Sequence, residues 1–283
     1  MKNLLESLDR MHITPDMDIR LIVVENDKEN HTEKIINEFL TKSKFSISYF
    51  LEPRQGIAYA RNRSVKEAYG SDFCCFVDDD QVVHPNWLVE LVKCQREFNA
   101  DGVWGSTPPL FNNNKIPSYI RQFHNPEIYA YGTIVKRAYT GCLLLRKELL
   151  DRINGPFDLR LNFTGGEDTY LTYLITNIGG VIRYTPNAIA YEIIPESRTT
   201  IKYIIKRTYR ISNTGLFVES LIDKNKAGWN ALPRLIMRFC RGLLIVFPFL
   251  LFGKSNKLIG IEKIADALGG FLFILGSKNK FYK

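Results

Sequence analysis

An apolar segment followed by three consecutive carboxylates constrains this 283-residue chain more than any other feature. Phe73 to Val77 are five apolar residues in succession, which predicts a strand buried on both faces. Asp78, Asp79 and Asp80 follow where this strand would end. In an open α/β sheet, ligands bind at the carboxyl ends of the strands. The segment therefore predicts a buried strand with a polar site at its end.

The acidic triplet has two interpretations. It is either a solvated turn ahead of a helix or a site for a hard cation such as Mg²⁺ together with a phosphate group. Alternate residues of an extended segment point the same way, so Asp78 and Asp80 would face one centre while Asp79 points elsewhere. The buried run before the triplet favours the cation and phosphate site.

Apolar patterns on both sides of this segment alternate between strand and helix. Strands are predicted over residues 19–24, 45–50 and 73–77, and helices over 4–11, 32–40, 57–69 and 85–98. This alternation predicts an α/β fold with a mostly parallel sheet, flanking helices and right-handed crossovers. Carboxylates also follow the first of these strands, at Glu25 and Asp27.

The segment from 106 to 137 is rich in proline and asparagine and is predicted to be a long irregular excursion. Its aromatic residues would suit stacking against a sugar, and packing inside the fold explains them equally well. These residues are Phe111, Tyr119, Phe123, Tyr129 and Tyr131.

Regular structure resumes after the excursion. Strands are predicted over 139–145 and 181–191, the second interrupted by Pro186 and reaching Glu192, with helices over 147–153 and 199–211. Another helix opens at Gly166-Glu167-Asp168 and runs to about Asn177. The helix dipole favours an ionised Asp168 in this first turn, although acidic residues are also common there for purely structural reasons.

Charge is distributed unevenly along the chain. The net charge is +8, but residues 198–283 carry +12 and residues 1–197 carry −4. The expected organisation is therefore an α/β domain over residues 1–197 and a basic tail over 198–283. Two apolar runs in the tail, 242–253 and 267–277, are shorter than the ~20 residues of a membrane-spanning helix.

Basic residues flank both apolar runs of the tail. This pattern is typical of helices at a membrane surface, and a helical hairpin buried against the domain is the alternative. The basic residues are not interleaved with stacking aromatics, which argues against nucleic acid as a partner. The polar start of the chain is not a secretory signal, and the five scattered cysteines indicate reduced thiols. A peripheral location at the cytoplasmic face of the inner membrane follows.

Five motifs, in this order and spacing, resemble the inverting family-2 glycosyltransferases of the GT-A fold, particularly bacterial exopolysaccharide and O-antigen enzymes. The resemblance covers about residues 4–210. The motifs are Val23 to Asp27, Gly56 to Asn62 with Ala60-Arg61-Asn62, Val77 to Asp80, Pro85 to Leu88, and Gly166 to Asp168.

The resemblance implies a role for several of these residues. Asp27 would bind the nucleobase of a nucleotide-sugar donor, Asp78 would lie near its ribose, and Arg61 would be a further donor-binding residue. Asp80 would be a direct ligand of the Mg²⁺ or Mn²⁺ that holds the donor pyrophosphate. Asp168 would be the general base.

The implied acceptor site lies beside this base. Glu167 would help to bind the acceptor, either a saccharide or a saccharide linked to polyprenyl diphosphate. Arg207 and Arg210 lie where relatives often carry cationic residues that assist with the diphosphate, and a solvated helix face explains them at least as well.

The sequence departs from the family pattern at two places. Relatives begin with a strand that is central in the sheet, whereas this chain begins with what resembles the helix that follows. Without that strand, its neighbours would have free apolar edges. Relatives also carry a metal-binding His after the last strand, and the matching residue here is Glu192, which can ligate Mg²⁺ or Mn²⁺ as well.

The resulting hypothesis is a metal-dependent, membrane-associated glycosyltransferase that moves a sugar, with inversion, from a nucleotide donor to a saccharide in cell-surface polysaccharide synthesis. The alternative is a catalytically impaired GT-A scaffold that binds partners, which the missing strand would favour. A metal-dependent nucleotidyltransferase is disfavoured, because the chain has no glycine-rich, basic phosphate loop near its start.

Overall fold

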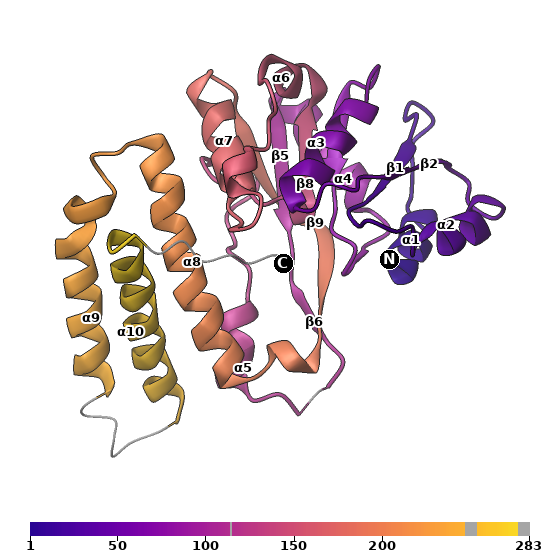
Figure 1. The fold of residues 1–283 in the computed structure, drawn as a ribbon. Coiled ribbons are helices and arrows are strands. Elements are labelled where there is room, and N and C mark those ends of the chain that lie inside the picture. The colour runs from indigo at the N-terminus through magenta and orange to yellow at the C-terminus, as the bar shows by residue number, and fades with distance from the viewer. Residues whose placement is uncertain (114, 247–253, 277–283) are drawn as a thin grey trace. The chain divides into compact units, whose positions relative to one another are not determined.

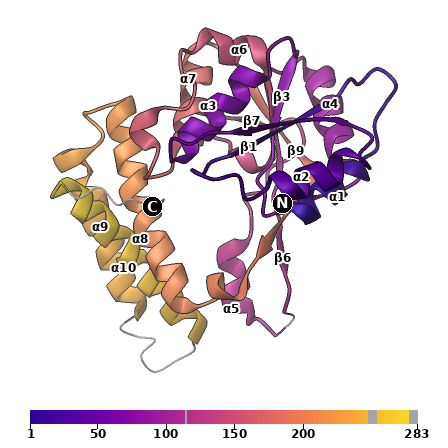
Figure 2. The same ribbon diagram turned by 45° about the vertical axis from the view of Figure 1, so that its right-hand side comes forward.

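The computed structural model describes residues 1–113, 115–246 and 254–276 (Figures 1 and 2). They belong to two compact units. The α/β unit contains Met1–Leu110, Pro126–Phe163 and Glu167–Ile193. The helical unit contains Phe111–Asn125, Thr164–Gly166 and Ile194–Lys283, so it includes two segments that lie inside the first domain expected from the sequence.

The α/β unit begins with the expected alternation of helices and strands. Its first elements are α1 (Lys2–Asp9), β1 (Arg20–Glu25), α2 (Glu33–Leu40), β2 (Ser46–Leu51), α3 (Ile57–Glu67), β3 (Phe73–Phe76), β4 (Gln81–Val83) and α4 (Trp87–Phe98). The expected elements agree with these bounds to within two residues. The sequence did not predict β4, a short strand that pairs antiparallel with β9 (Ile182–Ile194).

The second half of the unit returns the chain to the same sheet. It contains β5 (Gly102–Ser106), β6 (Pro109–Phe111), β7 (Ile134–Val135), η2 (Thr140–Cys142), β8 (Leu143–Arg146), α6 (Lys147–Arg152), η3 (Leu159–Leu161), α7 (Glu167–Asn177) and β9. β9 continues through Pro186 because its register against β5 shifts there, from Trp104 opposite Tyr184 to Ser106 opposite Ile189. Proline is tolerated at such an irregularity.

The strands form a separate two-stranded sheet, β1-β2, and a seven-stranded sheet of order β3-β8-β5-β9-β4, in which β6 and β7 also pair with β9. The expectation of a mostly parallel sheet is wrong. β1 and β2 are parallel, as are β5 and β9, but β8 is antiparallel to both β3 and β5. The chain enters β8 from an irregular segment rather than from a crossover helix, so nothing forces a parallel direction.

β1 and β3 each pair along one edge only among the described residues, β1 with β2 and β3 with β8. Only Cys74 of β3 is buried, and the other residues of that strand are half-buried. The expectation that this strand is buried on both faces is therefore wrong in part, because one of its edges is not covered by a strand.

Two apolar clusters cover the two faces of the larger sheet. Leu143 and Leu145 of β8 belong to the cluster that contains residues of α3, α6 and α7. Leu144 between them belongs to the cluster that contains residues of α1 and α4. Successive strand residues point to opposite faces, so this short apolar run contributes to both cores.

Burial raises the pKa of the Cys74 thiol of β3 to about 11, as expected of an unreactive core cysteine.

The helical unit contains α5 (Ser118–Arg121), η1 (Gln122–His124), η4 (Glu196–Arg198), α8 (Ile201–Ile222), η5 (Gly228–Ala231), α9 (Leu232–Val246) and α10 (Lys254–Ile274). α10 packs against both α8 and α9 (Figure 1). Glycines allow the close approach, since a Cβ at Gly260 would lie 3.0 Å from the carbonyl oxygen of Gly242 on α9. Asn213 of α8 donates a hydrogen bond to the carbonyl of Gly269, at 3.1 Å.

The apolar runs of the tail fall on these helices in part. Residues 242–246 lie in α9 and 267–274 lie in α10, whereas 247–253 and 277 lie outside the described residues. In the part of the chain that the structure describes, no helix is both long enough and apolar enough to span a bilayer.

Substituting Gly269 tests whether close helix packing stabilises the helical unit. A Cβ at Gly269 would lie 2.0 Å from the carbonyl oxygen of Tyr209, so we expect Gly269→Ala to lower the free energy of unfolding by about 1–3 kcal/mol. Gly215 of α8 has open space around it, and Gly215→Ala should be neutral or stabilise by about 0.5–1 kcal/mol. Denaturant unfolding of both variants would measure this, and equal stabilities would contradict the packing argument.

Candidate functional site

A largely buried arginine joins two parts of the α/β unit that are far apart in the sequence. Arg61 on α3 donates one hydrogen bond to Glu167 at the start of α7, and another to Asp78 after β3, with 3.2 Å between Nη2 and Oδ1. The Arg61 side chain is 13% exposed and that of Glu167 is 3% exposed, whereas Asp78 is 45% exposed. The guanidinium therefore links a buried carboxylate to one that water or a ligand can reach.

The two carboxylates at the start of α7 differ in their partners. Burial raises the pKa of Glu167 to about 7, against the opposing effect of Arg61. Burial also raises the pKa of Asp168, with Arg61 and the backbone N–H of Thr169 acting in the opposite direction. That N–H donates to Asp168 Oδ1 at 2.6 Å. A carboxylate with a raised pKa accepts a proton more readily at neutral pH, which suits Asp168 to act as a general base.

Residues that the sequence analysis missed hold the acidic triplet in place. The backbone N–H of Asp78 donates to Oε1 of Gln81 at 2.9 Å, and Gln81 itself is buried. Gly141 packs against this turn, since a Cβ there would lie 2.8 Å from Gln81 Nε2 and 3.3 Å from Asp78 Oδ2. The turn therefore depends on the buried amide of Gln81 and on the absence of a side chain at Gly141.

The pairing of β4 with β9 brings the backbone at Asp80 next to the strand that carries Glu192. Ile193 donates its backbone N–H to the carbonyl of Asp80 at 2.9 Å, and Gln81 lies opposite Glu192 in the register. No group of three or more His, Cys, Asp or Glu side chains suited to a metal occurs among the described residues. Mg²⁺ commonly takes only one or two protein carboxylates together with substrate phosphates, so the chemistry of Asp80 and of Glu192 suits such a cation, while the strand register pairs Glu192 with Gln81 and not with Asp80.

Asp27 lies just after β1, in the smaller sheet. Its Oδ1 accepts the backbone N–H of Lys28 at 2.7 Å, and its Oδ2 lies 3.9 Å from Nε2 of His31. The structure thus brings both Asp78 and Glu167 into direct contact with Arg61, and gives Asp27 local partners at the end of another strand.

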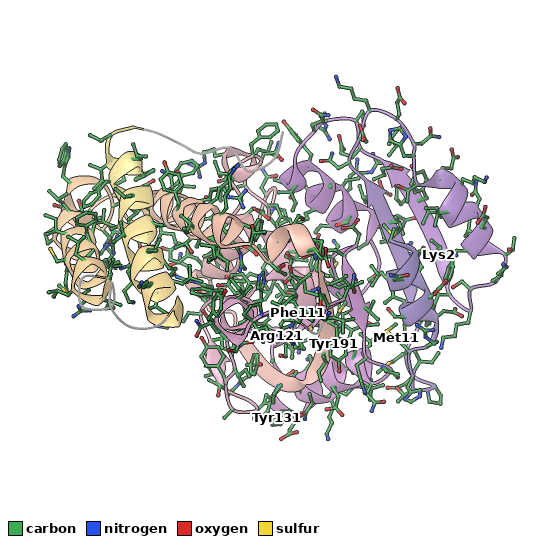
Figure 3. The ribbon with its side chains drawn as sticks, turned by 90° about the horizontal axis from the view of Figure 1, so that it is seen from below. Lys2, Met11, Phe111, Arg121, Tyr131 and Tyr191 are labelled. Carbon is green, nitrogen blue, oxygen red and sulfur yellow. The ribbon has the colours of Figure 1, made fainter. Side chains whose placement is uncertain are left out.

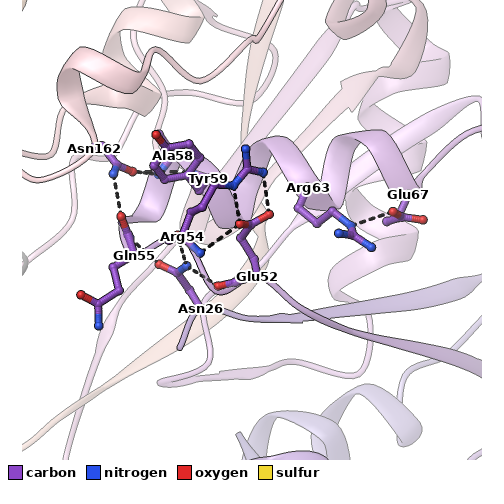
Figure 4. Close-up of polar contacts among 10 residues, drawn as sticks. Asn26, Glu52, Arg54, Gln55, Ala58, Tyr59, Arg63, Glu67 and Asn162 are labelled. Carbon is purple, nitrogen blue, oxygen red and sulfur yellow. Dashed lines mark hydrogen bonds and ion pairs between the residues drawn. The ribbon is translucent and has the colours of Figure 1, made fainter. Parts of the chain in front are cut away.

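Asn26 fixes the loop that leads into α3 (Figure 4). Its Nδ2 donates to the carbonyls of Glu52 and Arg54, at 3.0 and 2.8 Å, and its Oδ1 accepts the N–H of Gly56 at 2.7 Å. Gly56 has a φ of 126°, a conformation that favours glycine. The loop before the helix that carries Arg61 is therefore held by side-chain to backbone hydrogen bonds.

Asn162 caps the start of α3 from a distant part of the sequence (Figure 4). Its Oδ1 accepts the N–H groups of Ala58 and Tyr59 in the first helical turn, at 3.0 and 3.4 Å, and the Tyr59 N–H also donates to the carbonyl of Gly56 at 3.1 Å. Its Nδ2 donates to the carbonyl of Gln55 at 2.9 Å. A Cβ at Gly56 would lie 1.9 Å from this amide, so a glycine is required there.

Asn62, the neighbour of Arg61 in the motif, has a positioning role. It exchanges two hydrogen bonds with the backbone of Phe157, at 2.7 and 3.0 Å. The Arg61 guanidinium also lies over the Phe157 ring, 5.8 Å from its centroid. These contacts fix the face of α3 from which Arg61 projects.

The aromatic residues of the excursion belong to different surroundings. In the helical unit, Tyr119 and Phe123 pack against the cluster of Ile120, Ile204 and Leu258, and Arg121 lies over the Phe111 ring at 5.1 Å (Figure 3). In the α/β unit, Tyr131 packs on Phe98 and donates its hydroxyl to Glu97 at 2.7 Å. Packing explains these four aromatics, whereas Tyr129 is 38% exposed.

Comparison with known proteins identifies similar chains. The sequence model described as Glycosyl transferase family 2 matches residues 1–153. The "Succinoglycan biosynthesis protein ExoM" of Rhizobium meliloti (strain 1021) is 30% identical over 250 residues, which are 86% of this chain and 80% of that protein. An "N-acetylglucosaminyltransferase" of Azorhizobium caulinodans is 21% identical, over 73% of this chain and 56% of that protein.

Solved structures share the fold at low sequence identity. TarS residues 1–349 of S. aureus in complex with UDP-GlcNAc has a TM-score of 0.52 and 13% identity, covering 95% of this chain and 86% of that one. GalNAc-T7 with UDP, GalNAc and Mn²⁺ also has a TM-score of 0.52 and 13% identity, covering 75% and 47%. The chain spans about half, 52%, of the longer TarS structure.

Removing the buried guanidinium should destabilise the α/β unit strongly. Arg61→Met leaves the buried Glu167 without its cationic partner, so we expect the free energy of unfolding to fall by about 3–5 kcal/mol. Arg160→Met is the matched control, because Arg160 is 58% exposed in its ion pair with Asp158. An exposed pair contributes about 0–1 kcal/mol. Denaturant unfolding would measure both, and similar losses would contradict a special role for Arg61.

Proposed function

Because this chain belongs to glycosyl transferase family 2 and has the GT-A fold, we propose that it transfers a sugar from a nucleoside diphosphate donor to a saccharide acceptor during polysaccharide synthesis. The observation that carries the proposal is the juxtaposition of Asp78, Arg61 and Glu167 beside Asp168. The names of relatives support it, since one acts in succinoglycan biosynthesis and a structural neighbour binds UDP-GlcNAc.

The proposed reaction is a single displacement. The acceptor hydroxyl gives its proton to the Asp168 carboxylate as its oxygen forms a bond to C1 of the donor sugar. The bond from C1 to the diphosphate oxygen breaks on the opposite face, and its electron pair leaves with the nucleoside diphosphate. One displacement inverts the anomeric centre, and the raised pKa of Asp168 favours the proton transfer.

Binding of the donor would use both sheets. Asp27 would contact the nucleobase and Asp78 the ribose, while Arg61 holds Asp78 in position. Mg²⁺ or Mn²⁺ held by Asp80 and Glu192 would neutralise charge on the leaving diphosphate. Glu167 is buried against Arg61, which supports an indirect contribution to the acceptor site through the position of α7.

We also propose that the acceptor is lipid-linked and that the protein works at the cytoplasmic face of the membrane. Support comes from α9, which exposes apolar side chains beside basic ones. Ile236, Met237, Leu243 and Leu244 are 47%, 50%, 46% and 71% exposed, and Arg238 and Arg241 lie among them. This combination suits an anionic lipid surface.

Turnover with a panel of UDP-, GDP- and dTDP-sugars and methyl glycosides tests the function. We expect nucleoside diphosphate release with one donor, and Asp168→Asn should reduce it by about 10²–10⁴-fold because the base is lost. Calorimetry should show nearly unchanged donor binding. Asp72→Asn, an exposed Asp in the same unit, is the control and should retain activity.

Two results would contradict this assignment. A parallel loss of donor binding in Asp168→Asn would remove Asp168 from the base role. Donor binding without turnover in the unmodified protein would instead support a non-catalytic scaffold.

Metal dependence is tested at the acidic triplet. Asp80→Asn should abolish the enhancement of donor binding by Mn²⁺ or Mg²⁺ in calorimetric titrations, because a cation ligand is lost. Asp79→Asn, at the exposed neighbouring position, should keep that enhancement. An unchanged Mn²⁺ response in Asp80→Asn would contradict the ligand assignment.

Membrane association is tested at α9. The double variant Ile236→Glu with Leu244→Glu should weaken binding to phosphatidylcholine and phosphatidylglycerol vesicles by at least about tenfold, because apolar burial in the bilayer is lost. Leu159→Glu with Ile178→Glu changes two comparably exposed residues of the α/β unit and should bind normally. Co-sedimentation measures both, and equal binding would refute α9 as the contact.

A further inference from the structure

Four aromatic rings of the α/β unit form a cluster with a buried and an exposed layer. Trp104 and Tyr184 are buried, at 2% and 0% exposure, whereas Tyr129 and Tyr139 are 38% and 36% exposed. The Trp104 ring centroid lies 5.3 Å from that of Tyr184, 5.5 Å from that of Tyr139 and 6.1 Å from that of Tyr129. The inner rings therefore support the outer ones directly.

The packing within this cluster fixes the exposed rings. Trp104 meets Tyr139 and Tyr184 edge-on, with interplanar angles of 78° and 67°, and Tyr129 meets Tyr184 at 75°. Such edge-to-face contacts stabilise aromatic pairs beyond the burial of their area. The Tyr129 hydroxyl is also tethered, since it donates to Glu127 at 2.7 Å. Two tyrosines are thus held rigidly while part of each ring faces solvent.

Tyr139 is close in the chain to a segment that packs against the acidic turn after β3. Burial raises the pKa of Tyr139, and the negative charges of Glu127 and Asp168 raise it further, while Arg137 lowers it. Tyr139 also directly precedes η2, whose Gly141 packs against the Asp78 turn. One short segment therefore connects the exposed ring to the acidic end of β3.

We propose that Tyr139 and Tyr129 form the subsite for the acceptor sugar, in which the C–H face of a pyranose ring packs on the exposed tyrosines. The proposal rests on the proposed function. Tyrosine presents a large, partly apolar surface with little loss of conformational entropy on binding, and exposed apolar patches commonly mark ligand sites.

The charged groups around the cluster suit the rest of a sugar. Glu127 and Arg137 carry opposite charges and both influence the pKa of Tyr139, and sugar hydroxyls can donate to the first and accept from the second. The proposal assigns Tyr139 and Tyr129 to binding of the acceptor and not of the donor.

Saturation-transfer NMR tests this subsite directly. The probes are methyl α- and β-glycosides of glucose, galactose, mannose and N-acetylglucosamine, added to the full chain with Mg²⁺ and UDP. We expect ring-proton signals from at least one glycoside, and Tyr139→Ala should weaken its binding by about tenfold. Tyr139→Phe keeps the ring and should bind normally. Tyr69→Ala, which removes a 70% exposed tyrosine elsewhere in the unit, is the matched control.

Three results would overturn the subsite. They are no signal from any glycoside, equal signals in Tyr139→Ala and the unmodified protein, and loss of donor rather than glycoside affinity in Tyr139→Ala. Donor titrations of the same samples separate this failure from that of the proposed function. Normal donor turnover without a tyrosine effect would discard the subsite alone, whereas absent donor binding and turnover would discard the proposed function.

Discussion

The candidate site depends on the two ion pairs that the Arg61 guanidinium makes with Glu167 and Asp78. A charge with 13% exposure must be paired, and its partners Glu167 and Asp78 come from the start of α7 and the end of β3. Replacing such a pair by apolar residues often stabilises a protein, so a buried ion pair is weak evidence of a stability function. Here its role is to position residues, because it joins α3, the start of α7 and the turn after β3 and so keeps the carboxylates of the site close together.

The position of Arg61 gives the adjacent carboxylates of Glu167 and Asp168 different chemistry. Glu167 is buried against Arg61 and is the counter-ion of the site. Asp168 is half-buried and lacks so close a cation in the contacts described, and burial raises its pKa. Neighbouring residues of one helical turn can therefore serve different purposes, one as a structural partner and the other as a proton acceptor.

The sequence predicted the residue types of the site better than their connections. The order of most strands and helices followed from local patterns, and the resemblance carried by the ordered motifs implied the family and the GT-A fold. The Arg61 to Glu167 pair spans 106 positions, and no local pattern encodes it. The mixed sheet was missed for a similar reason, because the direction of β8 depends on how the excursion returns to the sheet rather than on the apolar run of Leu143 to Leu145.

The residues of the site that the sequence analysis did not identify all carry an amide side chain. Asn26, Asn162 and Gln81 satisfy backbone groups around the site, and an amide side chain that does so looks like any surface amide in a sequence. Two of them leave an indirect signal, since Asn162 requires Gly56 and Gln81 lies against Gly141. A glycine beside a motif therefore indicates that another segment approaches its backbone closely, but only the fold reveals which segment. The parts of the site that the sequence cannot predict are those in which one chain segment satisfies the backbone of another.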